Sequence, residues 1–180
     1  MLKPSRLIAI GVAVVVAVVA IPSASYASIG DGQSTLWKNY SNNLCMGVAG
    51  GNSQVKDGTA IITWTCNGSA DQTWILSLVD PNQPSGPYFI KNSWATSECL
   101  SVAAKSTSAN ARLVLWHCKG ASDNQDQRWY LSGDRQSPYV YLWNYNSGLV
   151  ATALNGGNGA PIAQEPQGNT WFPLDAWLSV

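Results

Sequence analysis

Beyond residue 27, the chain alternates short apolar runs with clusters of turn-forming residues. The runs over 59–66 and 113–118 are rich in β-branched and aromatic residues, which favour strands. The clusters at 49–52, 67–69 and 119–124 contain the Gly, Asn, Ser and Asp residues that are typical of turns. No segment in this part keeps an apolar period of 3.6 residues over three turns, so the pattern predicts an all-β protein.

The first 27 residues have the pattern of a secretory signal peptide. Lys3 and Arg6 precede an uninterrupted apolar run over 7–21, and a small-residue site ends at Ala27. The alternative is an uncleaved membrane anchor, but the run is shorter than the roughly 20 residues that span a bilayer. We therefore expect cleavage after Ala27, which leaves 28–180 as a secreted, extracellular domain that is not bound to a membrane.

Three sequence repeats, at about 34–80, 86–133 and 137–180, organise this domain. Each opens with an apolar residue two positions before an Asn, and a Gln-x-Trp motif follows near the end of the first two repeats. A single unit of this length cannot bury its apolar face alone, so we expect about twelve short strands in six hairpins, packed into one body. The opening residues are Asn39, Asn92 and Asn144, and the motif copies are Gln72–Trp74, Gln127–Trp129 and, more weakly, Asn169–Trp171.

The four cysteines follow the same repeat. The first repeat holds Cys45 and Cys66, and the second holds Cys99 and Cys118 at equivalent positions. Four cysteines allow three connectivities, and repeat symmetry selects the pairing within each repeat. Export exposes the chain to oxidising conditions, so we expect both disulfides to form, each contributing about 3 kcal/mol in the chain-entropy model.

Composition and charge exclude several classes of protein. Ten cationic and ten anionic residues give a formal net charge of zero, and only 11% of residues are charged. A nucleic-acid partner is therefore not expected, because phosphate binding needs clustered positive charge. The 46% of hydrophobic residues, including nine Trp, can form a core and speak against disorder.

The order of the landmarks resembles the ricin-B-type (R-type) lectin domain, whose bacterial members are also called family 13 carbohydrate-binding modules. Two full copies of Cys-x-x-Val, Trp-x-Cys and Gln-x-Trp lie between Ser34 and the C-terminus, with cysteine pairs in phase. The resemblance implies a β-trefoil of three pseudo-symmetric units with a shallow sugar site in each. In such sites an aromatic ring stacks on the sugar, while Asp, Asn and Gln side chains bind its hydroxyls.

The family's aspartate is the main departure in this chain. In the family it lies two residues after the first Cys, where this chain has Gly47, Ser101 and, if Leu149 is set opposite the Cys, Ala151. A carboxylate makes hydrogen bonds roughly twice as strong as those of a neutral group. We therefore expect weak sugar binding, which gains strength only when several sites act together.

Other positions of the family's site are retained in the first two repeats. The second repeat is the leading candidate and the first comes next, whereas the third is expected to be structural. Each retained residue also has a structural interpretation, since Trp packs on sheets, Asp forms turns and Gln satisfies backbone groups. The candidate sugar-binding residues are Ser101, Trp116, Asp126 and Gln127 in the second repeat and Trp64, Asp71 and Gln72 in the first. In the third repeat Glu165, Gly168 and Asn169 replace the Trp, Asn and Gln of the family, and Trp74, Trp129 and Trp171 are expected in the core.

Signatures of catalysis are not found in the sequence. The single His117 has no recognisable nucleophile context, and cysteines phased for disulfides leave no Cys/His metal set. We therefore expect no enzyme activity, no metal and no cofactor. The leading hypothesis is a secreted, non-catalytic carbohydrate-binding module whose partners are glycans or polysaccharide. The alternative is a trefoil that has lost sugar binding and serves as a protein-interaction or inhibitor scaffold.

Overall fold

The computed structural model describes residues 29–120, 123–133, 139–168 and 174–180. In these ranges the chain forms twelve β-strands and four 3₁₀ helices of three residues each, and none of the helices is long enough to cross a membrane. The strands are β1 (Ser34–Asn39), β2 (Cys45–Val48), β3 (Ile61–Trp64), β4 (Thr73–Leu78), β5 (Tyr88–Asn92), β6 (Glu98–Val102), β7 (Ala111–His117), β8 (Arg128–Ser132), β9 (Tyr139–Asn144), β10 (Val150–Ala153), β11 (Ile162–Glu165) and β12 (Trp177–Ser179). The 3₁₀ helices are η1 (Asn52–Gln54), η2 (Ala70–Gln72), η3 (Ala103–Lys105) and η4 (Gln125–Gln127).

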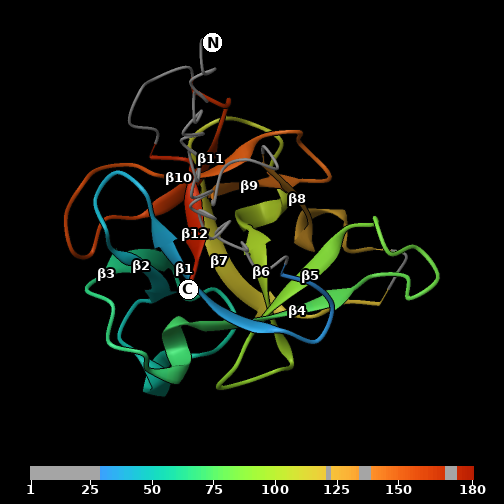
Figure 1. The fold of residues 1–180 in the computed structure, drawn as a ribbon, viewed down its shortest axis with the longest axis horizontal. Helices are drawn as coiled ribbons and strands as arrows, with labels where there is room; N and C mark the ends of the chain where they lie inside the picture. Colours follow the sequence, from blue (N-terminus) through green and yellow to red (C-terminus); the bar gives the residue numbers. More distant parts are fainter. Residues whose placement is uncertain (1–28, 121–122, 134–138, 169–173) are drawn as a thin grey trace, which may run out of the picture.

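Six of the strands close into a barrel. Strand β1 pairs with β4, and the antiparallel pairing continues through β5, β8, β9 and β12. The ring is completed where β12 returns to β1, with Trp37 opposite Ser179. Figure 1 shows β12 at the C-terminal end running beside β1. Closure leaves no free edge in the barrel, because every one of the six strands has a neighbour on each side.

The other six strands form three hairpins that cap the barrel. The hairpins are β2–β3, β6–β7 and β10–β11, one from each repeat. They contact one another through the β7–β11 pairing and through single bridges from Ala60 to Val114 and from Ile62 to Pro161. A six-stranded barrel with three capping hairpins is a β-trefoil, so the predicted fold is confirmed. Five of the six expected hairpins are β2–β3, β4–β5, β6–β7, β8–β9 and β10–β11. The place of the sixth is taken by the β12–β1 pair, which joins two segments far apart in the sequence.

Three tryptophans at equivalent positions anchor the core. Trp74, Trp129 and Trp177 are fully buried, and each indole nitrogen donates to a carbonyl of its own capping hairpin. The acceptors are the carbonyls of Met46, Leu100 and Ala151, at 3.0, 2.9 and 2.8 Å. The expected core positions of Trp74 and Trp129 are thus observed. Trp177 occupies the third position, whereas Trp171 and Asn169, which the sequence assigned to this motif, lie outside the described residues.

Strand register also corrects the alignment of the third repeat. Val150 faces Glu165 as Cys45 faces Trp64, so Val150 takes the cysteine position that the sequence assigned to Leu149. Thr152, and not Ala151, is therefore the counterpart of Gly47 and Ser101. The error arose because the third repeat has no cysteine to fix the alignment, and an apolar pair, Leu149 and Val150, fits equally well.

The three asparagines that open the repeats join each repeat to a neighbouring one. All three are buried, and each side-chain amide donates to a backbone carbonyl, of the preceding repeat for Asn92 and Asn144 and of the third repeat for Asn39. Asn92 reaches Asp71, Asn144 reaches Asp126, and Asn39 reaches Leu174, at 3.0, 2.9 and 2.7 Å. These bonds give a hydrogen-bond donor to three carbonyls that lie outside the barrel strands. Two of these bonds hold the short helices η2 and η4 against the barrel, and each of these helices carries two of the candidate site residues.

Both disulfides have the pairing that repeat symmetry predicts. Cys45 is bonded to Cys66 and Cys99 to Cys118, with Cα atoms 5.0 Å apart in each pair. Each bond ties the start of a capping hairpin to the loop that follows its second strand. Each disulfide therefore holds the loop that follows Trp64 or Trp116 close to the candidate site of its repeat.

Candidate functional site

Two hollows lie at equivalent places in the first and second repeats. The first has a volume of about 290 Å³ and the second about 250 Å³. Each lies between a capping hairpin and the 3₁₀ helix that follows it, so the same backbone frame shapes both. The first is lined by Val48, Gly50, Gly51, Ile62, Trp64, Asn67, Asp71 and Gln72. The second is lined by Ser101, Val102, Ala104, Lys105, Val114, Trp116, Lys119 and Asp126.

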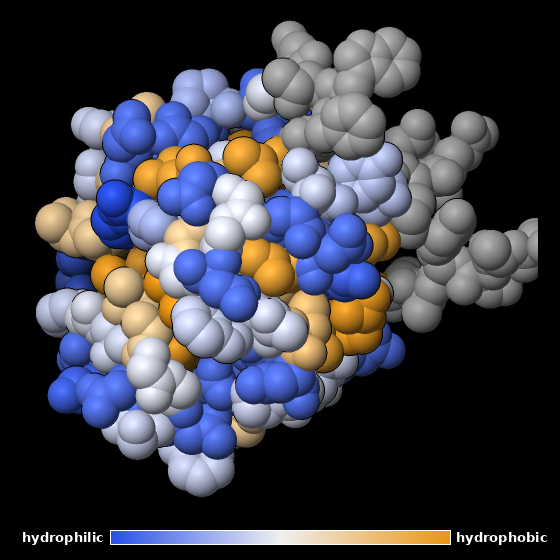
Figure 2. Space-filling model, turned by 90° about the vertical axis from the view of Figure 1, so that its left-hand side faces the viewer, coloured by the Kyte–Doolittle hydropathy of each residue, from blue (hydrophilic) through white to orange (hydrophobic). Residues whose placement is uncertain are grey.

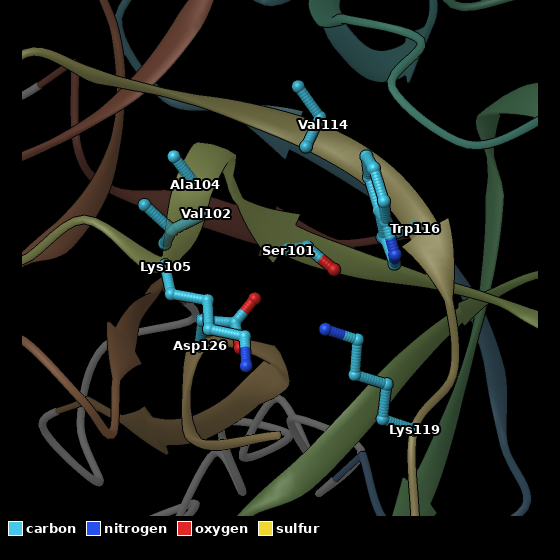
Figure 3. A pocket seen from close by; sticks show the side chains of 8 residues that line it. All are labelled: Ser101, Val102, Ala104, Lys105, Val114, Trp116, Lys119 and Asp126. Atoms are coloured by element: carbon cyan, nitrogen blue, oxygen red, sulfur yellow. The ribbon is translucent and has the colours of Figure 1, made fainter. Parts of the chain in front are cut away.

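The second hollow combines an apolar wall with a polar floor. Trp116, at the end of β7, is 42% exposed and forms the wall together with Val114 and Val102. Figure 3 shows Ser101 and Asp126 at the base, with the side chain of Lys119 extending toward them. An exposed aromatic beside buried oxygen acceptors suits a ligand with one apolar face and several hydroxyls.

Asp126 is the buried charge of this hollow. Helix η4 places it there, and only 4% of the residue is exposed. Its Oδ1 atom makes no hydrogen bond with any described residue. Burial raises the pKa of the Asp126 carboxyl, although Lys119 and Lys105 nearby favour its charged form. A buried acceptor without a donor is unfavourable by itself, so this oxygen is poised to accept from a ligand hydroxyl.

Gln127 lies behind the hollow and does not line it. The residue is fully buried, and its amide nitrogen donates to the hydroxyl of Ser101 and to the carbonyl of His117, at 2.9 and 3.0 Å. Its amide oxygen accepts from the backbone nitrogen of Lys119 at 2.9 Å. Gln127 therefore positions Ser101 and the loop at Lys119. The structure brings together Ser101, Trp116 and Asp126 and leaves the fourth candidate in a supporting position.

The tryptophans of the two hollows contact glycines of neighbouring repeats. A Cβ atom at Gly58 would lie 3.9 Å from the Trp116 ring, and one at Gly159 would lie 3.8 Å from the Trp64 ring. Both glycines have positive φ angles, of 79° and 77°, at the turns that bring them to these rings. Each ring thus lines a hollow of its own repeat and contacts a glycine of another repeat. Both rings remain substantially exposed.

The first hollow keeps a carboxylate although its β2 strand does not supply one. A Cβ atom at Gly47 would lie 3.4 Å from Oδ2 of Asp71. The carboxylate of Asp71, which η2 supplies, therefore occupies the space beside position 47. Its Oδ1 accepts from the hydroxyl of Ser69 at 2.5 Å. Gln72, with its amide bonded to Asn67 and Thr65, closes the same corner.

The third repeat has a different set of residues at these positions. Glu165 stands where the other repeats have an exposed Trp, and Leu174 stands where they have Asp71 and Asp126. Asp175 is buried and accepts from the backbone nitrogen of Gly168 at 2.9 Å, as Gln72 and Gln127 accept in their repeats. Asp175 is therefore the counterpart of the Gln, a place that the sequence gave to Asn169. Among its described residues, this repeat therefore has neither a Trp nor an Asp at the two positions that supply the aromatic wall and the carboxylate in the other two.

Sequence reasoning missed the lysines of the second hollow. Lys105 and Lys119 stand at its rim, at the positions of Gly51 and Asn67 in the first. The repeat alignment could have found them, because it places each lysine opposite a neutral residue. Over the described residues, no group of three or more His, Cys, Asp and Glu side chains is placed to hold a metal ion. The face drawn in Figure 2 mixes polar and apolar residues without one continuous apolar area.

The fold and these repeated hollows define the class of protein. The closed barrel with three capping hairpins is a β-trefoil. At the same point of two repeats, its cap has a ligand-sized hollow in which an aromatic residue lies beside a carboxylate. The chain belongs to the family of the ricin-type β-trefoil lectin domain, whose pattern matches residues 33–169. No protein in a search of curated sequences matches it at a significant level.

Solved structures with the same fold come from several sources. The designed threefold-symmetric protein ThreeFoil is 21% identical, with a TM-score of 0.69 over 82% of this chain and 97% of its own. An exo-β-1,3-galactanase from Clostridium thermocellum is also 21% identical, with a TM-score of 0.68 over 81% of this chain, which spans only 30% of that enzyme. A ricin B-like lectin from Macrolepiota procera, solved in complex with lactose, is 14% identical, with a TM-score of 0.64 over 85% of this chain and 98% of its own. At these identities the likeness concerns the fold.

Proposed function

We propose that this chain is a secreted, non-catalytic carbohydrate-binding protein that takes one sugar residue in each hollow of the first two repeats. The observation that carries the proposal is the recurrence of one constellation at two equivalent places. Each hollow has an exposed tryptophan from the second strand of the capping hairpin and a largely buried aspartate from the following 3₁₀ helix. Family membership supports a carbohydrate ligand, and a relative of the same fold is solved with lactose bound.

The chemistry of the hollows fits a pyranose. The indole ring of Trp64 or Trp116 offers an apolar face on which a sugar ring stacks, and Asp71 or Asp126 accepts hydrogen bonds from its hydroxyls. Each hollow has a single carboxylate among its lining residues, whereas hydrolysis of a glycosidic bond ordinarily uses two. This supports binding without cleavage. Both hollows are small and open, so useful affinity comes from engaging two sugars of one polysaccharide.

A glycan array followed by titration calorimetry tests the proposal. Trp116→Ala and Trp64→Ala should each weaken binding, since removal of a central aromatic anchor costs about 2 kcal/mol, or about thirtyfold in Kd at a single site. Trp94→Ala is the matched control, because Trp94 is 59% exposed and lines neither hollow. Binding that survives the double variant would overturn the assignment of the site. If no glycan binds the unaltered protein, and a protein is recovered with it instead, the trefoil is an interaction scaffold.

A further inference from the structure

The hollows of the first and second repeats share a frame but differ in charge. Their tryptophans, apolar residues and aspartates occupy matching places. The differences in charge are at two rim positions, where Lys105 replaces Gly51 and Lys119 replaces Asn67. The second hollow therefore has two cations that the first does not, while each has one lining carboxylate. Because the frame is the same, this difference in charge is the main difference in what the two can recognise.

The two lysines differ in how firmly they are held. Lys119 is half-buried, and Gln127 fixes its backbone nitrogen from below. In Figure 3 its side chain points into the hollow toward Ser101 and Asp126. Lys105 is more exposed and is paired with Asp123 at the outer rim, with a nitrogen-to-oxygen distance of 2.5 Å. Lys119 is thus the inner cation and Lys105 the outer one.

The backbone that carries Lys105 is held in an uncommon conformation. Ala104 and Lys105 have φ angles of 53° and 54°, in the left-handed region. Their counterparts Gly50 and Gly51 have φ angles of 84° and 72°, which glycine adopts without cost. A residue with a Cβ atom is strained in this region, because the Cβ atom comes too close to the carbonyl oxygen that follows. The second repeat keeps two such residues where the first has glycine, and the result places a cation at the rim.

The aspartates of the two hollows also differ in their partners. In the first repeat, Ser69 donates to Asp71. Its counterpart in the second repeat is Asn124, which turns away to bond Arg128 and the carbonyl of Lys119. Oδ1 of Asp126 is left without a donor among the described residues, although the residue is only 4% exposed. The second hollow therefore combines a buried acceptor that has no donor among the described residues with an inner cation, Lys119.

We propose that the hollow of the second repeat binds an anionic sugar, one that carries a carboxylate or a sulfate ester, whereas that of the first repeat takes a neutral sugar. The proposal rests on the proposed function and deepens it by naming the ligand class of each site. The sugar ring stacks on Trp116, a hydroxyl donates to Asp126, and the anionic group lies beside the ammonium of Lys119. Lys105 adds a weaker attraction from the rim, because Asp123 already neutralises part of its charge.

Titration calorimetry with three probes tests the ligand class. A galacturonate trisaccharide supplies carboxylates, its methyl ester is the uncharged counterpart, and a sulfated galactose oligosaccharide supplies sulfate esters. We expect the unaltered protein to bind at least one anionic probe more tightly than the methyl ester. The preference should weaken with added salt, as for any partly exposed ion pair. Whichever anionic probe binds more tightly identifies the source of the anionic group.

Residue swaps between the repeats locate the preference. Lys119→Asn gives the second hollow the residue of the first, and it should weaken binding of the preferred anionic probe about fivefold while the methyl ester is unaffected. Asn67→Lys should move the first hollow toward anionic probes. Lys38→Asn removes the same charge from β1, away from both hollows, and should change nothing.

The outcomes separate this inference from the proposed function. Equal affinity for charged and uncharged probes, or an anionic preference that survives Lys119→Asn, would overturn the inference. The proposed function would still hold if those probes bound in a manner that depended on Trp64 and Trp116. Absence of binding by every probe and by a glycan array would overturn both. Near-ultraviolet circular dichroism of each variant shows whether the tryptophan core is intact.

Discussion

The side-chain amide nitrogen of Gln127 donates a hydrogen bond of 2.9 Å to the hydroxyl oxygen of Ser101. Both residues are buried, and the bond ties the 3₁₀ helix η4 to strand β6 beneath the second hollow. The sequence named both residues as candidate sugar contacts and gave Gln127 a structural interpretation as well, as an amide that satisfies backbone groups. Their contact with each other means that Gln127 acts through Ser101 and the loop at Lys119, so its effect on binding is indirect.

Loss of the Gln127 amide should therefore lower the free energy of unfolding. Gln127→Ala leaves the backbone nitrogen of Lys119 and the carbonyl of His117 without their buried partner, which should lower the free energy of unfolding by about 2–4 kcal/mol. Urea denaturation followed by tryptophan fluorescence measures the change. Gln125→Ala, at an exposed position of the same helix, is the control and should be near neutral. A variant as stable as the unaltered protein would show that these bonds contribute little.

Asp126 should make the protein less stable as pH rises. Burial raises the pKa of this carboxyl, so the folded state holds its proton more tightly than the unfolded state does. That stability is complete below the ordinary carboxyl pKa of about 4 and is lost as pH increases through the folded value. Lys105 and Lys119 oppose the loss, and Asp123 adds to it. Asp126→Asn should therefore gain stability over the unaltered protein as pH rises above the ordinary carboxyl pKa, and urea midpoints at several pH values measure this.

The same substitution should weaken glycan binding at the second hollow, because an amide accepts hydrogen bonds less strongly than a carboxylate does. A gain in stability with a loss of binding would fit a site that is strained to receive a ligand. If the difference in urea midpoint stays constant with pH, Asp126 does not titrate in this range.

Restoring the family's aspartate in the first repeat should be harmful. A Cβ atom at Gly47 would lie 3.0 Å from Cγ of Gln72 and 3.4 Å from the carboxylate of Asp71. Gly47→Asp therefore crowds Gln72 and sets two carboxylates side by side, which should lower the free energy of unfolding by about 1–3 kcal/mol at neutral pH. Adding Asp71→Ser removes one of the two charges and should recover part of the loss. Tighter sugar binding by the Gly47→Asp single variant would contradict this account.

The buried side chain of Asn92 should contribute substantially to the free energy of unfolding. Its amide nitrogen donates to the carbonyl of Asp71, and its amide oxygen accepts from the backbone nitrogen of Trp94. Asn92→Ala leaves both groups unpaired at the junction of two repeats and should cost about 2–4 kcal/mol in urea denaturation. Asn82→Ala, in an exposed turn, is the matched control. Equal effects of the two substitutions would mean that the junction between repeats is held by other contacts.

Much of the fold could be predicted from sequence because two repeats retain their cysteines. Phased disulfides and the Gln-x-Trp motif fixed the alignment of the first two repeats, and with it the positions of Trp74 and Trp129 in the core. The third repeat has no disulfide, and its motif is reduced to Asp175 and Trp177, since an Asp takes over the acceptor position of the Gln. From the sequence alone, the replacement of Gln by Asp175 cannot be told apart from an alignment that places the motif a few residues earlier, at Asn169.

The site was predictable only in part, for a different reason. Sequence similarity places Trp116 and Asp126 at the hollow but cannot tell that Gln127 faces the backbone, because an amide fits either environment. It also gives no weight to Lys105 and Lys119, which correspond to no residue of the family's pattern. Their significance comes from the comparison of two hollows in the same chain, which needs the register of the strands.

Closure of the barrel by β1 and β12 has a consequence for how the molecule is made. Leu36 and Val180 exchange backbone hydrogen bonds, at 2.9 and 3.1 Å, so the ring is complete only when the last residues of the chain are in place. Pairing of such distant segments is slow, because the entropy of closing a long loop is lost before any contact rewards it. A truncated product without β12 would expose the unpaired edges of β1 and β9 to other chains. The three residues of β12 thus determine whether the barrel closes or leaves two strand edges open to pairing with another chain.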